Sequence, residues 1–299
     1  MKKEVEKLLQ YVQKPARYIG GELNAVIKDK EKIDIRYAFC FPDTYEIGMS
    51  HLGMKIIYGL VNDRQDSWCE RVFAPDNDME EQMRKNNVPL FALESGDYIK
   101  DFDMIGFTLM YELSYTNVLN MLNLAKIPLK SSERESLTPL ICVGGPCACN
   151  PEPITDFVDI VFLGDGEEST NEVIDLLKYA KENNLTKHEF LLKAKDIRGV
   201  YVPSFYKDSY NDDGTLKELK PLFGAPEKVK KAVVSDMNSV YYPKEFVVPY
   251  INIVHDRAVE EIFRGCIRGC RFCQAGFIYR PIREKSVETI NKQSKALID

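Results

Sequence analysis

The sequence lacks the features of membrane-spanning, disulfide-rich or nucleic-acid-coating proteins. It has no apolar run of about 18 residues, which an ordinary transmembrane helix requires. Its first residues mix lysine and glutamate and contain no apolar signal core, so we expect a cytoplasmic protein. Eight cysteines in 299 residues are too few for a disulfide scaffold, and a reducing compartment favours metal or redox roles for them. A net charge of −6 argues against broad attraction to nucleic acid or anionic membranes.

The composition is that of a globular protein with a core of its own, because 44% of the residues are hydrophobic and 29% are charged. Runs rich in β-branched, apolar or aromatic residues predict strands at 33–41, 68–73, 104–109, 140–143 and 158–163. Amphipathic segments predict helices at 52–61, 79–85, 115–124 and 173–180. Strands that alternate with helices predict an α/β fold, with a doubly wound parallel sheet of the Rossmann or flavodoxin type.

The periodicity divides the chain into four parts. We expect an N-terminal helical segment over residues 1–30, the α/β domain over 31–185, an extended connector over 186–257 and a new unit over 258–299. Four prolines between residues 220 and 256 favour the connector, and the run from Asn211 to Gly214 predicts a turn. The last unit is expected to contain a strand at 259–263, a cysteine-rich loop and a helix from about residue 287.

Cys266, Cys270 and Cys273 form the most informative motif, with the spacing C-x3-C-x2-C. Three thiols on one loop can face a single metal centre, and thiolates are the ligands that zinc and iron–sulfur clusters select. Three cysteines would leave one iron of a four-iron cluster open for chemistry. The alternatives are a zinc knuckle with a fourth ligand from elsewhere, or three unrelated buried cysteines. Zinc sites usually come as C-x2-C pairs, and His255 is the only histidine nearby.

This spacing, with Phe272 directly before the third cysteine, resembles the radical S-adenosylmethionine (SAM) superfamily. The wider string from Glu261 to Ser286 resembles an uncharacterised subfamily whose N-terminal domain is similar to cobalamin (B12)-binding domains. The resemblance implies that Cys266, Cys270 and Cys273 hold a [4Fe-4S] cluster whose open iron chelates SAM. Reduction by a donor such as flavodoxin or ferredoxin would cleave SAM to methionine and a 5′-deoxyadenosyl radical. Phe272 would pack on the adenine side.

Three predicted strand ends resemble the cofactor loops of cobalamin-binding domains. Those domains carry D-x-H-x-x-G, S-x-L and G-G at positions where this chain has Asp43, Tyr45 and Gly48, then Thr108, then Gly144 and Gly145. Tyr45 stands where the cobalt-ligating histidine would be, and a phenol is a poor ligand for Co(III). Two interpretations therefore remain open: cobalamin binds without that histidine, or the domain keeps the fold without the cofactor.

Three further segments of the sequence carry smaller predictions. The turn at 164–168, Gly-Asp-Gly-Glu-Glu, resembles a glycine–acid turn common in this fusion of domains. His51 is interpreted as an ordinary residue at the start of a helix. Cys40, Cys69 and Cys142 lie in or beside predicted core strands, where a free cysteine behaves as a small hydrophobic residue.

The catalytic domain of the resembling family is a partial (β/α) barrel, which needs about 200 residues. Residues 258–299 supply only its start, so we expect the front half of a longer protein: a fragment, a split gene product, or a subunit whose missing C-terminal half is a separate chain. Such a chain would assemble a cluster but not perform turnover. Three functions are considered: a radical SAM enzyme of unknown substrate, a non-catalytic iron–sulfur or metal-binding module, and a cobalamin-binding domain with an incomplete catalytic tail.

Overall fold

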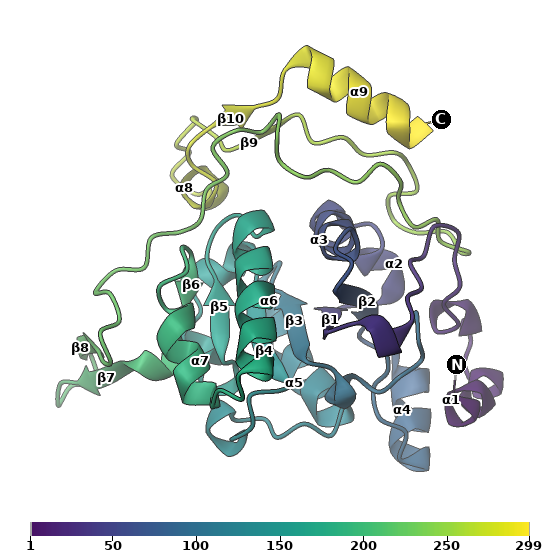
Figure 1. Ribbon diagram of the computed structural model, residues 1–299, viewed down its shortest axis with the longest axis horizontal. Coiled ribbons are helices and arrows are strands. Elements are labelled where there is room, and N and C mark those ends of the chain that lie inside the picture. The colour runs from purple at the N-terminus through teal and green to yellow at the C-terminus, as the bar shows by residue number, and fades with distance from the viewer. Residues whose placement is uncertain (1, 299) are drawn as a thin grey trace.

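The computed structural model describes residues 2–298, and a six-stranded sheet with helices on both faces forms its centre (Figure 1). The strands are β1 (Ile35–Phe41), β2 (Ser67–Phe73), β3 (Met104–Thr108), β4 (Leu140–Gly144), β5 (Ile160–Phe162) and β6 (Val200–Tyr201). Their order is β2-β1-β3-β4-β5-β6, and all neighbours are parallel except β5 and β6. The predicted doubly wound α/β fold is confirmed.

Seven α-helices belong to this part of the chain, within its described residues. They are α1 (Lys3–Leu8), α2 (Tyr45–Gly48), α3 (Leu52–Asn62), α4 (Asn77–Asn86), α5 (Tyr115–Leu124), α6 (Glu167–Glu182) and α7 (Lys187–Ala194). The predicted helices correspond to α3, α4, α5 and α6. Helix α6 begins six residues before the predicted residue 173, because its first turn, Glu-Glu-Ser-Thr-Asn, has no apolar spacing to detect.

The sheet separates two hydrophobic cores. Successive residues of β1 point to opposite faces, so Ala38 and Cys40 join one core while Tyr37 and Phe39 join the other. Helices α1, α4 and α5 cover the first face, and α3, α6 and α7 cover the second. The cysteines of β1, β2 and β4 are fully buried in these cores, which confirms that they serve packing.

The α/β domain continues beyond residue 185, where the connector was expected to begin. Helix α7 and strand β6 follow, and β6 pairs with β5 through Val161–Tyr201 and Phe162–Val200. The run 199–203 predicts a short strand, and β6 confirms it, but so short a run does not show that the strand joins the main sheet. The turn predicted at 211–214 is present, and it joins β7 (Tyr206–Tyr210) and β8 (Leu216–Pro221) in an antiparallel hairpin.

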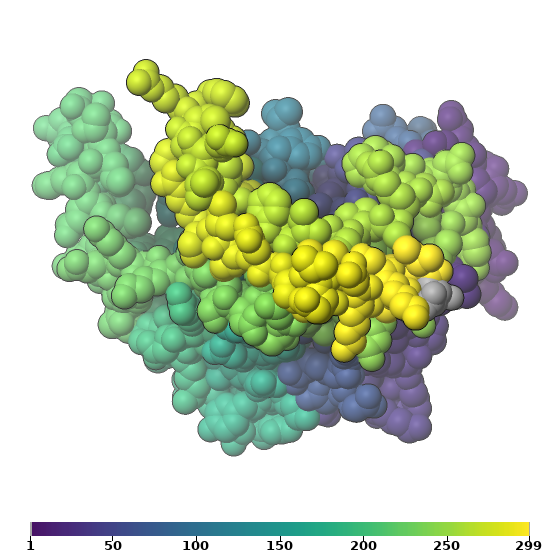
Figure 2. All heavy atoms as spheres, turned by 90° about the horizontal axis from the view of Figure 1, so that it is seen from above, coloured from purple at the N-terminus to yellow at the C-terminus, as the bar shows by residue number. Residues whose placement is uncertain are grey.

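The C-terminal segment lies across the carboxyl ends of the strands (Figures 1 and 2). It contains β9 (Phe263–Arg264), α8 (Ala275–Ile278), β10 (Arg283–Glu284) and α9 (Val287–Ile298). Of the strand expected at 259–263, only Phe263 lies in a strand. It forms β9 with Arg264, because β10 has only two residues to pair with. No helix among residues 2–298 is both long and apolar enough to cross a membrane.

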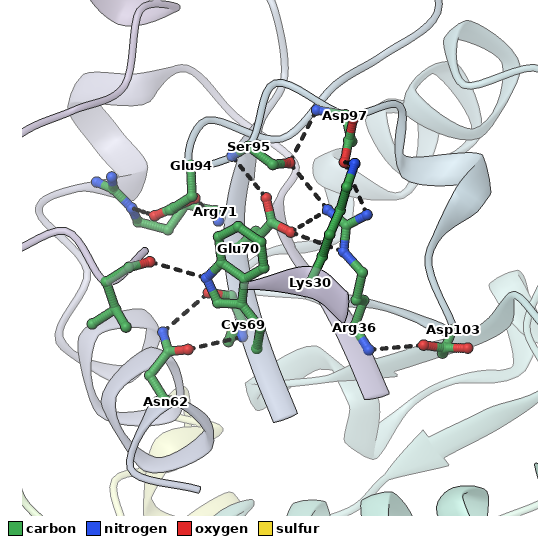
Figure 3. A network of polar contacts seen from close by, with 12 residues as sticks. Lys30, Arg36, Asn62, Cys69, Glu70, Arg71, Glu94, Ser95, Asp97 and Asp103 are labelled. Carbon is green, nitrogen blue, oxygen red and sulfur yellow. Dashed lines mark hydrogen bonds and ion pairs between the residues drawn. The ribbon is translucent and has the colours of Figure 1, made fainter. Parts of the chain in front are cut away.

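Buried charges connect the first two strands to the loop after α4 (Figure 3). Arg36 on β1 contacts Glu70 on β2 at 2.5 Å and Asp97 at 3.0 Å. Arg71 is only 2% exposed, and its guanidinium contacts both Glu94, at 2.6 Å, and Glu22, at 2.8 Å. Since removing one partner of a buried pair leaves an uncompensated charge, this network fixes how the loop and the N-terminal segment dock.

Candidate functional site

A cavity of about 450 Å³ lies at the carboxyl ends of the strands, between the sheet and the C-terminal segment. Its floor is formed by side chains of β1, β3, β4 and β5, and the residues that close it from the C-terminal segment include Phe263, Arg264 and Tyr279. Ligands of doubly wound sheets bind at this edge, where the strand order changes direction. The lining is largely aromatic and aliphatic with a few polar groups, which suits an organic molecule.

Three of the residues predicted as cobalamin contacts meet in this cavity: Thr108, Gly144 and Gly145 all line it. Gly145 has a φ of +97°, and a Cβ atom there would lie 2.8 Å from the carbonyl oxygen of Leu109 and 3.0 Å from Oγ1 of Thr108. Only glycine allows the turn after β4 to approach the end of β3 this closely. The glycine pair therefore shapes the cavity wall.

The structure places the other three predicted contacts elsewhere, since Asp43, Tyr45 and Gly48 do not line the cavity. Tyr45 is buried, and its hydroxyl donates a hydrogen bond to Oε1 of Glu22 at 2.9 Å. Burial and the neighbouring carboxylate raise the pKa of Tyr45, so the phenol stays protonated. Asp43 accepts a hydrogen bond of 2.7 Å from the hydroxyl of Tyr111. Gly48 packs directly against Phe73, leaving no room for a side chain.

His51 caps the N-terminus of α3, as expected for a residue at the start of a helix, and it also lines the cavity. Its Nδ1 accepts a hydrogen bond from the backbone N–H of Met54 at 3.1 Å. Burial, with a smaller contribution from Lys55, lowers the pKa of His51 to about 4. The ring is therefore neutral near pH 7, and the bond to Met54 assigns its proton to Nε2. The sequence shows the cap, but not that the ring reaches a cavity.

The turn at 164–168 contributes two acidic side chains to the cavity lining. Asp165 and Glu167 both line it, and both contact Arg264, with Oδ1 of Asp165 at 3.3 Å from the guanidinium. Arg283 contacts the same carboxylate of Asp165 through its own guanidinium. Sequence reasoning singled out this turn without identifying its partners, which lie about 100 residues further along the chain.

Cys266, Cys270 and Cys273 lie on one loop between β9 and β10. All three carry free thiols; that of Cys270 is exposed and the other two are half-buried. Across residues 2–298, no three or more His, Cys, Asp or Glu side chains are arranged to hold a metal ion, so the thiols share a loop without converging on one point. Positive φ angles at Gly265 and Gly269 bend this loop. Thiolates are the protein ligands of iron–sulfur clusters, so these three residues are the candidates to hold one if their side chains turn towards one another.

The ring of Phe272 sits on the same loop, between Cys270 and Cys273. It is 92% exposed and is not among the residues that line the cavity. Phe272 is thus next to the cysteines in sequence, and the structure exposes its ring to solvent outside the cavity.

The molecule is thus an α/β protein with an apolar cavity at the switch point of its sheet and a cysteine-bearing loop above it. Residues 53–203 match the family model for the N-terminal part of radical SAM proteins, and the chain belongs to this family. The predicted resemblance to radical SAM proteins is confirmed at this level.

One curated relative and one solved structure show how far the similarity extends. The chain is 27% identical over 254 residues to an uncharacterized protein from Methanocaldococcus jannaschii, which covers 85% of this chain and 44% of that protein. The chain therefore spans less than half the length of this relative. It is also similar to TsrM from Kitasatospora setae, a radical SAM methyltransferase solved with its tryptophan substrate and a SAM analog. That likeness has a TM-score of 0.45 and 10% identity, and covers 87% of this chain and 45% of the other.

Proposed function

We propose that this chain is the front part of a radical SAM enzyme and that Cys266, Cys270 and Cys273 hold its [4Fe-4S] cluster. The observation that carries the proposal is the set of three free thiols on the loop between β9 and β10, in a chain of the radical SAM N-terminal family. When bound and reduced, such a cluster would supply the electron that cleaves SAM to methionine and a 5′-deoxyadenosyl radical. An electron carrier such as flavodoxin or ferredoxin would serve as the donor.

The chain's own residues suit the charge of such a site. A cluster ligated by thiolates is negatively charged, and Arg268 and Arg271 lie between its cysteines while Arg264 and Arg283 flank the loop. The guanidiniums of Arg268 and Arg271 would attract the anionic cluster and the carboxylate of SAM, while those of Arg264 and Arg283 are paired with Asp165. The exposed ring of Phe272 would offer an apolar face to the adenine.

The cavity supports a second part of the proposal, that the α/β domain binds cobalamin. Thr108, Gly144 and Gly145 would form the contacts, because these three of the six candidate residues line the cavity. Tyr45 would not replace the axial histidine, since its hydroxyl is bonded to Glu22 in the interior. Cobalamin would therefore bind without a side-chain ligand from this position. The alternative is a domain that keeps the fold and uses the cavity for another organic molecule, or for none.

We propose that turnover needs a longer protein, since the chain matches only 44% of its curated relative. A partial (β/α) barrel needs about 200 residues, and residues 258–298 supply one two-stranded sheet, β9 and β10, and the helices α8 and α9. We propose that the remaining strands, on a continuation of the chain or on a partner subunit, complete the SAM and substrate sites. The domain division would then be an α/β domain from about residue 31, a connector, and the first part of the radical SAM domain from residue 258.

The decisive experiment is anaerobic reconstitution with iron and sulfide, followed by electron paramagnetic resonance (EPR) of the reduced protein with and without SAM. We expect a [4Fe-4S]⁺ signal that shifts on addition of SAM and is lost in Cys266→Ala. Cys149→Ala is the matched control, because Cys149 is exposed but lies outside the loop. A zinc-loaded or cluster-free protein would instead favour a structural metal-binding module, or leave the cavity as the functional site.

A further inference from the structure

The loop that carries the three cysteines begins and ends at two arginines that face each other. Strand β9 ends at Arg264, strand β10 starts at Arg283, and the two residues are direct partners in the antiparallel register. Like charges placed opposite each other across a strand pair are destabilising. The base of the loop therefore closes only if a negative charge lies between the two guanidiniums.

Asp165 supplies that charge. Its Oδ1 lies 3.3 Å from Nη1 of Arg264, and its Oδ2 contacts Nη1 of Arg283. Glu167 adds a second carboxylate on Nη2 of Arg264, and Glu261 a third, at 2.7 Å from Nε. The side chains of Arg283 and Glu167 are only 8% and 7% exposed, so water screens this cluster weakly.

The carboxylate of Asp165 is held in place by the backbone around it. Its Oδ2 accepts a hydrogen bond of 2.8 Å from the N–H of Val234, and its own N–H donates to the carbonyl of Ala232 at 3.0 Å. Gly164 has a φ of +97°, and a Cβ atom there would overlap the carbonyl oxygen of Ala232. The turn is thus held by contacts with residues outside the loop, which is what an anchoring group requires.

We propose that Asp165 and Glu167 are positioning residues that hold the cysteine-bearing loop, residues 265–282, over the cavity. The importance of this anchor for the cluster rests on the proposed function. Elsewhere the loop contacts the connector through Lys231, whose Nζ donates to the carbonyl of Ile278 at 2.5 Å. It contacts the α/β domain where α8 packs on the short helix at Pro146–Cys149. Because Asp165, Glu167 and Arg264 also line the cavity, a ligand bound there would touch the residues that hold the loop.

Limited trypsin digestion of the cluster-free protein tests the anchor, because Arg268 and Arg271 lie in the loop and their side chains are exposed. We expect Asp165→Asn to speed cleavage at these arginines by about tenfold, since an unpaired buried charge promotes local opening. Glu168→Gln is the matched control: it changes the same charge in the same turn, and Glu168 forms no ion pair within residues 2–298.

Two further variants keep the test decisive. In Asp165→Asn/Arg283→Gln one of the two facing charges is removed, so cleavage should slow again towards the wild-type rate. If Asp165→Asn does not fold, as judged by circular dichroism, Glu167→Gln replaces it with the same expectation. Wild-type cleavage rates in a folded Asp165→Asn or Glu167→Gln would overturn the proposal.

Cluster loading separates this inference from the proposed function. We expect reconstituted Asp165→Asn to retain less iron than the wild type and to show a broadened EPR signal, while Glu168→Gln matches the wild type. A wild-type protein that takes up no cluster would refute the proposed function, and the trypsin result would still decide the anchor. The anchor alone would be refuted if the wild type loads a full cluster and Asp165→Asn matches it in both cluster loading and trypsin cleavage.

Discussion

The hydroxyl of Tyr45 lies 2.9 Å from Oε1 of Glu22, and the same carboxylate is held by Arg71 on β2. Tyr45 occupies the position at which cobalamin-binding domains carry the axial histidine, yet here it is one donor of a buried charged network. Its side chain points into the interior rather than towards the cavity at the carboxyl ends of the strands.

Tyr45→Phe is therefore expected to affect stability and not ligand binding. The variant loses one hydrogen bond to a carboxylate that keeps both of its bonds to Arg71, so the free energy of unfolding should fall by about 1–2 kcal/mol. Urea denaturation measures this change. Titration with hydroxocobalamin, followed by absorbance, should give the same result for the variant and the wild type. A variant that alone loses binding would place the phenol in the site after all.

Arg71→Met should destabilise the protein far more. The substitution leaves Glu22 and Glu94 buried without their shared cation, and breaking such a pair costs about 3–5 kcal/mol. Arg84→Gln is the control, because the side chain of Arg84 is 45% exposed and pairs with Glu80 one helical turn away, which contributes about 0.5 kcal/mol. Similar urea midpoints for the two variants would mean that Arg71 is not the centre of the network.

Acid should destabilise the protein partly through His51. The pKa of its ring is about 4 in the folded protein and 6.5 in its ordinary state, so the unfolded chain gains a proton that the folded chain does not. Stability from this residue is therefore complete above pH 6.5, falls as the pH drops from 6.5 to 4, and is constant below that range. His51→Asn retains an acceptor for the N–H of Met54 but cannot titrate. The loss of stability between pH 6.5 and 4 should be smaller in this variant than in the wild type.

Gly145→Ala tests the cavity wall. A methyl group there meets the carbonyl of Leu109 at 2.8 Å, at a φ that L-residues avoid, so the turn must shift and the cavity must change shape. Gly214→Ala is the control, because its φ is +83° but nothing lies within 4 Å of its Cβ position. Both variants carry the backbone penalty of about 1–2 kcal/mol. Only Gly145→Ala should weaken the binding of hydroxocobalamin, and equal binding would remove Gly145 from the site.

The strands could be predicted from the sequence because burial on both faces requires continuous apolar and β-branched runs, as in Ile35–Phe41. Features that depend on tertiary partners could not. The first turn of α6 is polar and shows no periodic pattern, and the short run at 199–203 predicts a strand but not its pairing with β5. Glu22 and Arg71 are 49 residues apart, and Arg264 and Glu167 are 97 apart. The choice of a charged partner at such separations follows from the folded backbone and leaves no local signal.

For the candidate site, the motifs indicated which strand ends matter but not which side chains face inward. Thr108 and Gly144 end strands β3 and β4, Gly145 comes next, and the direction of a parallel strand fixes where its end lies. Asp43, Tyr45 and Gly48 lie in the less regular loop and short helix after β1, where side-chain direction depends on neighbours such as Phe73 and Glu22. The sequence therefore located the edge of the sheet better than it located the contacts.

Strand β6 runs against β5, so the chain leaves the sheet at the end opposite the cavity and must return along the sheet edge to reach Ala232. The hairpin of β7 and β8 consequently projects at the far side of the molecule, at the lower left of Figure 1. Its tip, residues 211–214, is exposed. A fluorophore or an immobilisation tag attached there would be carried by the α/β domain while leaving both the cavity and the cysteines unobstructed, which makes the hairpin a natural handle for following what binds at the opposite end.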